Sequence, residues 1–192
     1  MSDIDTKRLF IAIELSLNIR SRLETLQKEL KKSGADAKWV EPENIHLTLK
    51  FLGNVETKKN KDIMETLNKI CAQRKRFTAT LDQLGAFPSL NSARVVWAGL
   101  NDKTDTLENI AEILDEALSQ LKFEKETRKF QTHVTLARIR SARNRVALIQ
   151  KIKEANQNFK TEDFSIDNIT LFESRLSPHG PTYAIVHQAK LL

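Results

Sequence analysis

Strand-like and helical segments follow one another irregularly along this chain, and that order restricts the fold more than any other feature. Segments with the apolar or alternating pattern of strands lie at 8–14, 45–52, 77–84, 94–99, 132–139, 164–172 and 182–188. Amphipathic segments with apolar residues three and four apart predict helices at 16–32, 57–72, 104–121 and 143–155. Because single helices do not separate every pair of strands, antiparallel pairing is favoured over a doubly wound parallel sheet. We therefore expect an α+β domain that could divide into two lobes.

The composition is that of a folded domain without a disulfide or thiol-based metal framework. Cys71 is the single cysteine, which rules out an intramolecular disulfide and fits a reducing compartment. No apolar run approaches the roughly 20 residues that span a bilayer, and residues 1–7 lack the hydrophobic stretch of a secretory signal. We expect one domain over residues 1–192, with two lobes that are not independent domains, in a cytoplasmic protein that does not enter a membrane.

The net charge is mildly positive and favours an anionic partner without identifying one. There are 31 Lys and Arg against 25 Asp and Glu, which gives +6 with neutral histidines. Such a balance raises the local concentration of anionic ligands and says nothing about the fold. Aromatic residues make up only 6%, fewer than a dedicated single-strand binder that stacks bases would need.

One short motif occurs twice, as His46-Leu47-Thr48-Leu49 and as His133-Val134-Thr135-Leu136. Each copy lies in a segment with strand alternation, so its His and Thr share one face of the sheet. We expect the residues between them, and Leu49 and Phe51 further along the first strand, to face the core. The alternative, two ordinary histidines on polar strand faces, is made less plausible by the matching placement of both copies.

Two such pairs supply the parts for displacement at phosphorus. Two imidazoles that titrate near neutral pH can act as a general base and a general acid. Two threonine hydroxyls can donate hydrogen bonds to non-bridging phosphate oxygens, where charge builds up. The sequence contains no metal-binding motif of recognisable spacing, so no metal or other cofactor is expected. Because the two motifs are nearly equivalent, the sequence does not assign the acid and the base.

The motifs and their flanking blocks resemble those of a known family nearly from end to end. Beside the two motifs, the resemblance rests on the following blocks: Arg8-Leu9-Phe10-Ile11-Ala12-Ile13, Trp39-Val40, Glu43 to Gly53, Gly85-Ala86-Phe87-Pro88, Arg94 to Gly99, Ala137-Arg138, Leu171 to Ser174 and Gly180-Pro181-Thr182-Tyr183. They are similar to the 2H phosphoesterases, and within these to the RNA 2′,3′-cyclic phosphodiesterases, also named 2′-5′ RNA ligases. Two positions depart from the pattern: Thr132 stands where many relatives have Pro, and Phe172 where Tyr is common.

The resemblance implies a bilobal 2H phosphoesterase fold, in which two pseudo-symmetric antiparallel β-sheet lobes with outer helices enclose a central cleft. It implies metal-independent hydrolysis of RNA 2′,3′-cyclic phosphate termini to 2′-phosphate, with 2′-5′ RNA ligation as a reverse activity. By the family pattern His46 is the proton donor and His133 the proton acceptor, while Thr48 and Thr135 bind the phosphate. The expected partners are RNA ends or nucleoside 2′,3′-cyclic phosphates, and a monomer without an obligate protein partner is expected.

Three further residues are candidate substrate contacts. Arg138, just past the second motif, would meet phosphate or RNA, although simple alternation puts it on the face opposite His133. Lys50 shares the expected strand face of His46 and would add positive charge to the cleft; otherwise it is a surface lysine at a strand end. Tyr183 would meet substrate near the cleft or make a structural hydrogen bond.

Two other functions remain open at this point. A sister 2H phosphoesterase would act on a different nucleotide, such as an ADP-ribose cyclic phosphate, and the motifs do not separate it from an enzyme of RNA ends. A non-catalytic RNA-binding module that keeps the fold would show salt-sensitive affinity without forming product. The intact motifs argue against this second alternative.

Overall fold

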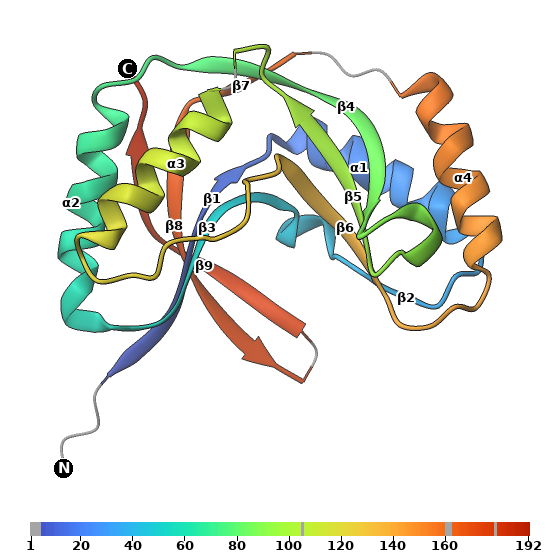
Figure 1. The fold of residues 1–192 in the computed structure, drawn as a ribbon, viewed down its shortest axis with the longest axis horizontal. Helices are drawn as coiled ribbons and strands as arrows, with labels where there is room; N and C mark the ends of the chain where they lie inside the picture. The colour runs from blue at the N-terminus through green and yellow to red at the C-terminus, as the bar shows by residue number, and fades with distance from the viewer. Residues whose placement is uncertain (1–4, 105, 160–162, 179) are drawn as a thin grey trace.

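One antiparallel sheet runs through the whole molecule, and helices cover it in two pairs (Figure 1). The computed structural model describes residues 5–104, 106–159, 163–178 and 180–192. The strands formed by these residues are β1 (Thr6–Glu14), β2 (Ala37–Trp39), β3 (His46–Glu56), β4 (Phe77–Phe87), β5 (Val95–Asn101), β6 (His133–Ile139), β7 (Phe164–Ile166), β8 (Asn168–Ser177) and β9 (Gly180–Lys190). The α-helices are α1 (Leu17–Lys31), α2 (Asn60–Cys71), α3 (Thr106–Ser119) and α4 (Arg145–Asn158), and a short 3₁₀ helix, η1 (Pro42–Asn44), precedes β3.

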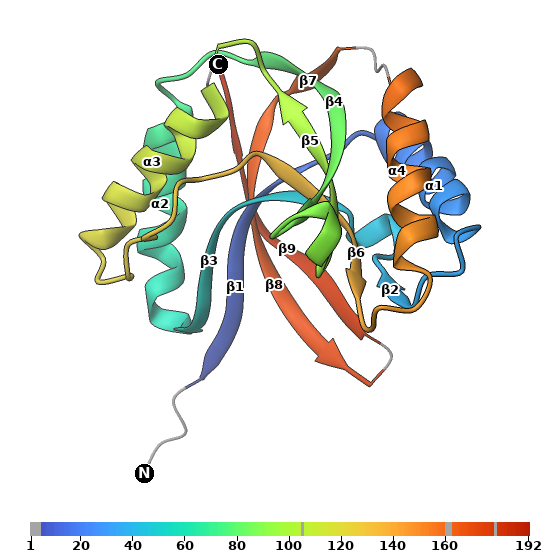
Figure 2. The same ribbon diagram turned by 45° about the vertical axis from the view of Figure 1, so that its right-hand side comes forward.

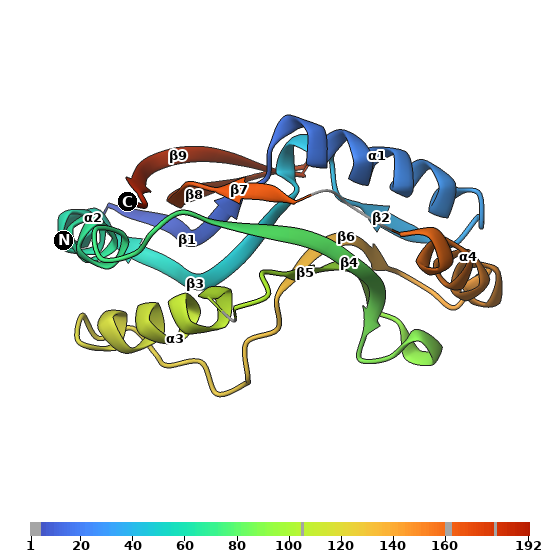
Figure 3. The same ribbon diagram turned by 90° about the horizontal axis from the view of Figure 1, so that it is seen from above.

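The sheet divides into two lobes that meet at its centre. Its strand order is β7-β4-β5-β6-β3-β1-β8-β9, with β2 also paired to β6. Lobe 1 consists of β3, β1, β8 and β9 with α2 and α3; lobe 2 consists of β6, β5, β4, β7 and β2 with α1 and α4 (Figures 2 and 3). The lobes join where β3 lies antiparallel to β6, with Leu47 opposite Val134. Each H-x-T motif therefore lies at the junction, on one of the two central strands.

The lobes exchange one helix each. Helix α1 follows β1 of lobe 1 but packs beside α4, at the far end of the molecule from α2 and α3. In the same way α3 follows β5 of lobe 2 but packs beside α2. The crossing comes after β1 in the first half of the chain and after β5 in the second half. The two halves therefore repeat one pattern.

Helix α1 shows how local sequence produces this packing. Its Ser16 hydroxyl caps the helix by accepting a hydrogen bond from the Ile19 amide at 3.4 Å. Leu23 and Leu30 follow on the same face and are fully buried, and each such side chain contributes about 1.5–3 kcal/mol by burial. The helix is followed by Gly34 at φ +67°, where its carbonyl accepts a hydrogen bond from the Asn144 side chain before α4. A β-carbon at Gly34 would lie 2.8 Å from that amide nitrogen, so the contact between α1 and α4 requires glycine.

The predicted helices are confirmed, as are the predicted strands other than 164–172, and every strand pair in the described part of the chain is antiparallel. Strand β2 was not predicted, because its three residues have no alternation long enough to detect. The predicted strand 164–172 divides into β7 and β8, which only Asp167 separates. The segment 164–172, predicted as one strand, therefore contributes to two different lobes. No helix in the described ranges combines the length and apolar character needed to span a membrane.

Candidate functional site

Each central strand carries a β-bulge immediately after its H-x-T motif. In β3 the neighbours Ile11 and Ala12 of β1 pair with Lys50 and Thr48, so Leu49 between them has no partner. The central strand of lobe 2, β6, has the same bulge. Val96 and Trp97 of β5 pair with Ala137 and Thr135, so Leu136 between them has no partner. The bulged residue is the fourth of its motif in both strands.

The bulges reverse the alternation of side chains beyond them. The fifth residue of each segment, Lys50 or Ala137, turns to the buried face, and the sixth, Phe51 or Arg138, turns to the face of the His and Thr. The expectation that Phe51 faces the core is wrong: its side chain is 69% exposed and lines the central cleft. Simple alternation also misplaced Arg138, which lines the same cleft as His133.

The same bulge corrects the expectation that Lys50 adds charge to the cleft. Its side chain is buried and forms an ion pair with Asp115 of α3, and its ammonium also donates to the Glu124 carbonyl at 2.8 Å. Lys50 is therefore neither a cleft residue nor a surface lysine. It ties α3 and the segment that leads toward β6 to the central strand.

The structure brings both motifs into one cleft of about 710 Å³, which is lined by His46, Thr48, His133 and Thr135 among others. Because Leu47 is opposite Val134, the antiparallel register places His46 across from Thr135 and Thr48 across from His133. The four side chains thus form a rectangle with the histidines on one diagonal and the threonines on the other. Residues on such a diagonal are about 7–8 Å apart, and their β-carbons are somewhat closer. A tetrahedral phosphate at the centre would have an imidazole on either side.

Both imidazoles are oriented by the same contact. Nδ1 of His46 lies 2.7 Å from the Asn44 carbonyl, and Nδ1 of His133 lies 2.6 Å from the Gln131 carbonyl, two residues earlier in each case. A carbonyl only accepts, so each Nδ1 carries a proton and donates it. This leaves Nε2 as the nitrogen that gains or loses a proton, and Nε2 of His46 lies 3.0 Å from the Thr48 hydroxyl.

Burial lowers the pKa of both histidines. For His46 desolvation is the main cause, the hydrogen bond to Asn44 opposes it, and the positive charge of Arg20 adds to it. For His133 desolvation again lowers the pKa most, the bond to Gln131 opposes it, and Arg138 adds to the lowering. Neutral imidazoles are therefore favoured in the free protein. An anionic phosphate between them would favour the charged forms.

Aromatic rings support the two histidines differently. The His46 ring lies 4.8 Å from the ring of Phe10 and 5.2 Å, edge to face, from the ring of Tyr183. Phe10 in turn stacks on Phe172 at 5.1 Å, so strands β1, β8 and β9 all support this histidine. His133 instead meets Phe87 edge to face at 4.9 Å. Tyr183 lines the cleft, as the expectation of a substrate contact requires, and burial raises the pKa of its hydroxyl.

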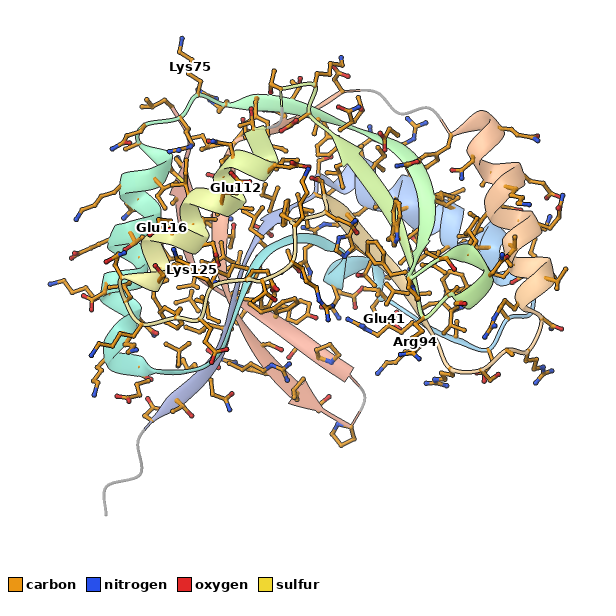
Figure 4. All side chains as sticks on the ribbon, viewed as in Figure 1. Glu41, Lys75, Arg94, Glu112, Glu116 and Lys125 are labelled. Carbon is orange, nitrogen blue, oxygen red and sulfur yellow. The ribbon has the colours of Figure 1, made fainter. Side chains whose placement is uncertain are left out.

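Several cleft residues were not singled out from the sequence. They include the cationic residues Arg8 and Lys38, which join the predicted Arg138, and the carboxylates Glu41 and Glu43. Glu41 is labelled in Figure 4 beneath lobe 2. The Asn44 side chain donates to the Pro181 carbonyl at 3.0 Å and so fastens η1 to the projecting hairpin of β8 and β9 (Figure 1). Lys38 lies opposite Arg138 on the unpredicted strand β2, which is why its approach to the cleft was missed.

Within the described ranges, no three or more His, Cys, Asp or Glu side chains form a group that could hold a metal ion.

A duplicated antiparallel fold with a His and a Thr from each half in one cleft defines a 2H phosphoesterase. The model of the family "LigT like Phosphoesterase" matches residues 13–97 and 99–183, once for each half, and the chain belongs to this family. This confirms the resemblance and the bilobal α+β fold that it implied.

Curated relatives and solved structures agree with that membership. The chain is 34% identical over 184 residues to the RNA 2′,3′-cyclic phosphodiesterase of Methanocaldococcus jannaschii, covering 94% of this chain and 99% of that protein. It is 35% identical over 169 residues to the protein of the same name from Aeropyrum pernix, covering 88% and 94%. Among solved structures, Escherichia coli LigT complexed with 3′-AMP matches with a TM-score of 0.75 and 26% identity, covering 97% of this chain and 99% of that one.

Proposed function

We propose that this protein hydrolyses RNA 2′,3′-cyclic phosphate ends to 2′-phosphates by acid–base catalysis with His46 and His133, without a metal. The observation that carries this proposal is the convergence of both H-x-T pairs on one cleft, with each Nδ1 fixed so that Nε2 is the reactive nitrogen. The names of the relatives support the substrate class.

The proposed reaction is a single displacement at phosphorus. Nε2 of His133 removes a proton from water as its oxygen bonds to phosphorus, the P–O3′ bond breaks, and Nε2 of His46 gives its proton to O3′. Thr48 and Thr135 donate hydrogen bonds to the non-bridging oxygens, where negative charge increases. The products are a 2′-phosphate and a free 3′-hydroxyl. With a 5′-hydroxyl in place of water, the same steps would form a 2′-5′ linkage.

The test is turnover of cytidine 2′,3′-cyclic phosphate in the presence of EDTA. His46→Ala and His133→Ala are each expected to reduce kcat by about 10²–10⁴-fold, the contribution of one acid or base. His187→Ala is the matched control, because His187 bonds to Asn68 on the surface of lobe 1. Near-normal turnover by either cleft variant, or loss of activity in EDTA, would show the proposal to be wrong.

An activated leaving group separates the acid from the base. A nucleoside 2′-(4-nitrophenyl) phosphate releases a nitrophenolate that needs no proton. His46→Ala should therefore regain much of its activity on this diester, whereas His133→Ala should not. If His133→Ala regains activity and His46→Ala does not, His133 is the acid and His46 the base. A parallel assay with an ADP-ribose cyclic phosphate tests the sister function, and preference for that substrate over RNA ends would contradict the proposed substrate class.

The proposal includes one domain over residues 1–192 that acts as a monomer in the cytoplasm. Helix exchange supports the single domain, because each lobe takes a helix from the other half of the chain. Residues 1–92 and 93–192 expressed separately should each fail to give a cooperative thermal transition, and two folded halves would contradict this. Light scattering after size exclusion tests the monomer against the mass of 22.0 kDa.

A further inference from the structure

A second cavity lies outside the cleft, where β6 passes into α4. It has a volume of about 280 Å³ and is lined by Ala93, Arg94, Ile139, Arg140, Ser141, Ala142 and Arg145. None of these residues lines the central cleft. Figure 4 shows Arg94 at the edge of lobe 2, beside the turn that joins β6 to α4.

The lining of this cavity is cationic and has no counter-charge. Three of its seven residues are arginines and none is acidic. None of the ion pairs found in the described part of the chain involves Arg94, Arg140 or Arg145. A planar guanidinium presents paired N–H donors that match two oxygens of a tetrahedral phosphate. The cavity is therefore suited to an anion with several oxygen acceptors.

Arg145 shows that this cluster is more than a group of solvated side chains. Its Nη1 donates to the Asn91 carbonyl at 3.2 Å, which holds the guanidinium in place. Its Nε is buried and has no hydrogen-bond partner in the described structure. A buried charged donor of this kind is stabilised by an acceptor that enters the cavity. Helix α4 also begins here without an acidic residue in its first turn or a side-chain cap, and its amide groups add positive potential.

We propose that this cavity binds a backbone phosphate of the RNA strand on the 5′ side of the reacting end. The proposal rests on the proposed function, because a 2′,3′-cyclic phosphate closes the 3′ end and leaves only the 5′ side of the strand to be bound. Arg140 is five residues past Thr135, which is roughly 17 Å along an extended strand. A stacked single strand rises about 3.4 Å per nucleotide, so the bound phosphate lies at most about five nucleotides from the reacting one.

The experiment compares substrate lengths in a double variant, Arg94→Gln with Arg140→Gln. Both side chains are exposed, and their replacement leaves the anchored Arg145 in place. For a decanucleotide ending in a 2′,3′-cyclic phosphate, KM is expected to rise about tenfold, equivalent to about 1.4 kcal/mol. The slope of log KM against log salt should decrease by about 0.7, the value for one phosphate contact on a single strand. For cytidine 2′,3′-cyclic phosphate, KM and kcat should stay within twofold of the wild-type values.

Arg143→Gln is the matched control, since Arg143 is an exposed arginine of the same turn that does not line the cavity. Equal effects on both substrates, no effect on the decanucleotide, or an equal effect of Arg143→Gln would each overturn the proposal. If inorganic phosphate stabilises the wild type but not the double variant against heat while decanucleotide KM is unchanged, the ligand is a free anion and not RNA. Anisotropy of a labelled decanucleotide with a 2′-phosphate end measures binding without turnover. A weaker affinity of the double variant there supports the cavity even if the cyclic phosphate is not hydrolysed.

Discussion

Gln27 is a buried polar residue on which the shape of the second motif depends, and its replacement gives a quantitative test. The side chain belongs to α1 and is 1% exposed. Its Nε2 donates to the Leu136 carbonyl at 2.9 Å and to the Val40 carbonyl at 2.8 Å. Leu136 is the bulged residue of β6, and its carbonyl also accepts from the Val40 amide at 2.9 Å. Gln27 thus fastens the bulge that turns Arg138 into the cleft.

Gln27→Leu removes these bonds at nearly constant volume. Two hydrogen bonds contribute about 1 kcal/mol each, and the Val40 carbonyl that is left buried without its donor adds a cost of about 1–3 kcal/mol. The greater apolar burial of leucine offsets part of this, by about 1 kcal/mol. The free energy of unfolding should therefore fall by about 2–4 kcal/mol, which lowers Tm by roughly 4–16 °C in a chain of this length.

Thermal and urea unfolding measure the stability, and KM for a cyclic phosphate measures the cleft. KM should rise because Arg138 loses its fixed position. The pKa of His133 should rise slightly because the Arg138 charge moves away, whereas the pKa of His46 should not change, because Arg138 is not among the groups that shift it. Gln150→Leu on the exposed face of α4 is the control and should change stability by no more than about 0.5 kcal/mol. If Gln27→Leu matches the control in both Tm and KM, the reasoning about the bulge is refuted.

Three further predictions concern the two histidines, the Lys50 ion pair and Phe51. Burial keeps the folded pKa of His46 and His133 below 6.5, so the unfolded chain takes up protons first as the pH falls. Unfolding free energy should decrease as the pH drops below about 6.5, less steeply in His46→Gln, and equal slopes in pH-dependent urea melts would contradict this. Lys50→Met removes the ion-pair partner of Asp115, which keeps the hydrogen bond from the Glu126 amide, and should cost about 3–5 kcal/mol in urea unfolding. The pair Lys50→Met with Asp115→Leu should recover most of that loss, and additive losses would argue against the buried pair. Phe51→Ala removes an exposed apolar side chain from the lining of the cleft. KM for cytidine 2′,3′-cyclic phosphate should rise about fivefold while Tm stays unchanged. A lower Tm without a change in KM would indicate that Phe51 is a core residue.

The fold and the meeting of the two H-x-T motifs in one cleft could be predicted from the sequence because both depend on local periodicity. Strand alternation placed His46 and Thr48 on one face, and the repeat of the pattern at His133 implied a second strand facing the first. The register of Leu47 opposite Val134 is a long-range property, but the equivalence of the two motifs was enough to anticipate that they meet.

The positions of Lys50, Phe51 and Arg138 could not be predicted in this way. A bulge inserts one residue without a distinctive sequence signal and reverses every side chain after it. Leu49 and Leu136 are buried with or without a bulge, so their identity does not reveal it. Gln27 was missed for a related reason, because a polar residue in an amphipathic helix is taken as solvent-facing unless its buried partners are known.

Because β1 pairs with β8, lobe 1 can be completed only near the end of synthesis. Every element of lobe 2 is made before residue 168, whereas β1 waits with an unpaired edge until β8 emerges and Phe10 meets Phe172. The wall that supports His46 is therefore the last part of the protein to form. A chain interrupted after α4 carries both histidines and both threonines but lacks the β8–β9 wall of the cleft and the rings of Phe172 and Tyr183 beside His46.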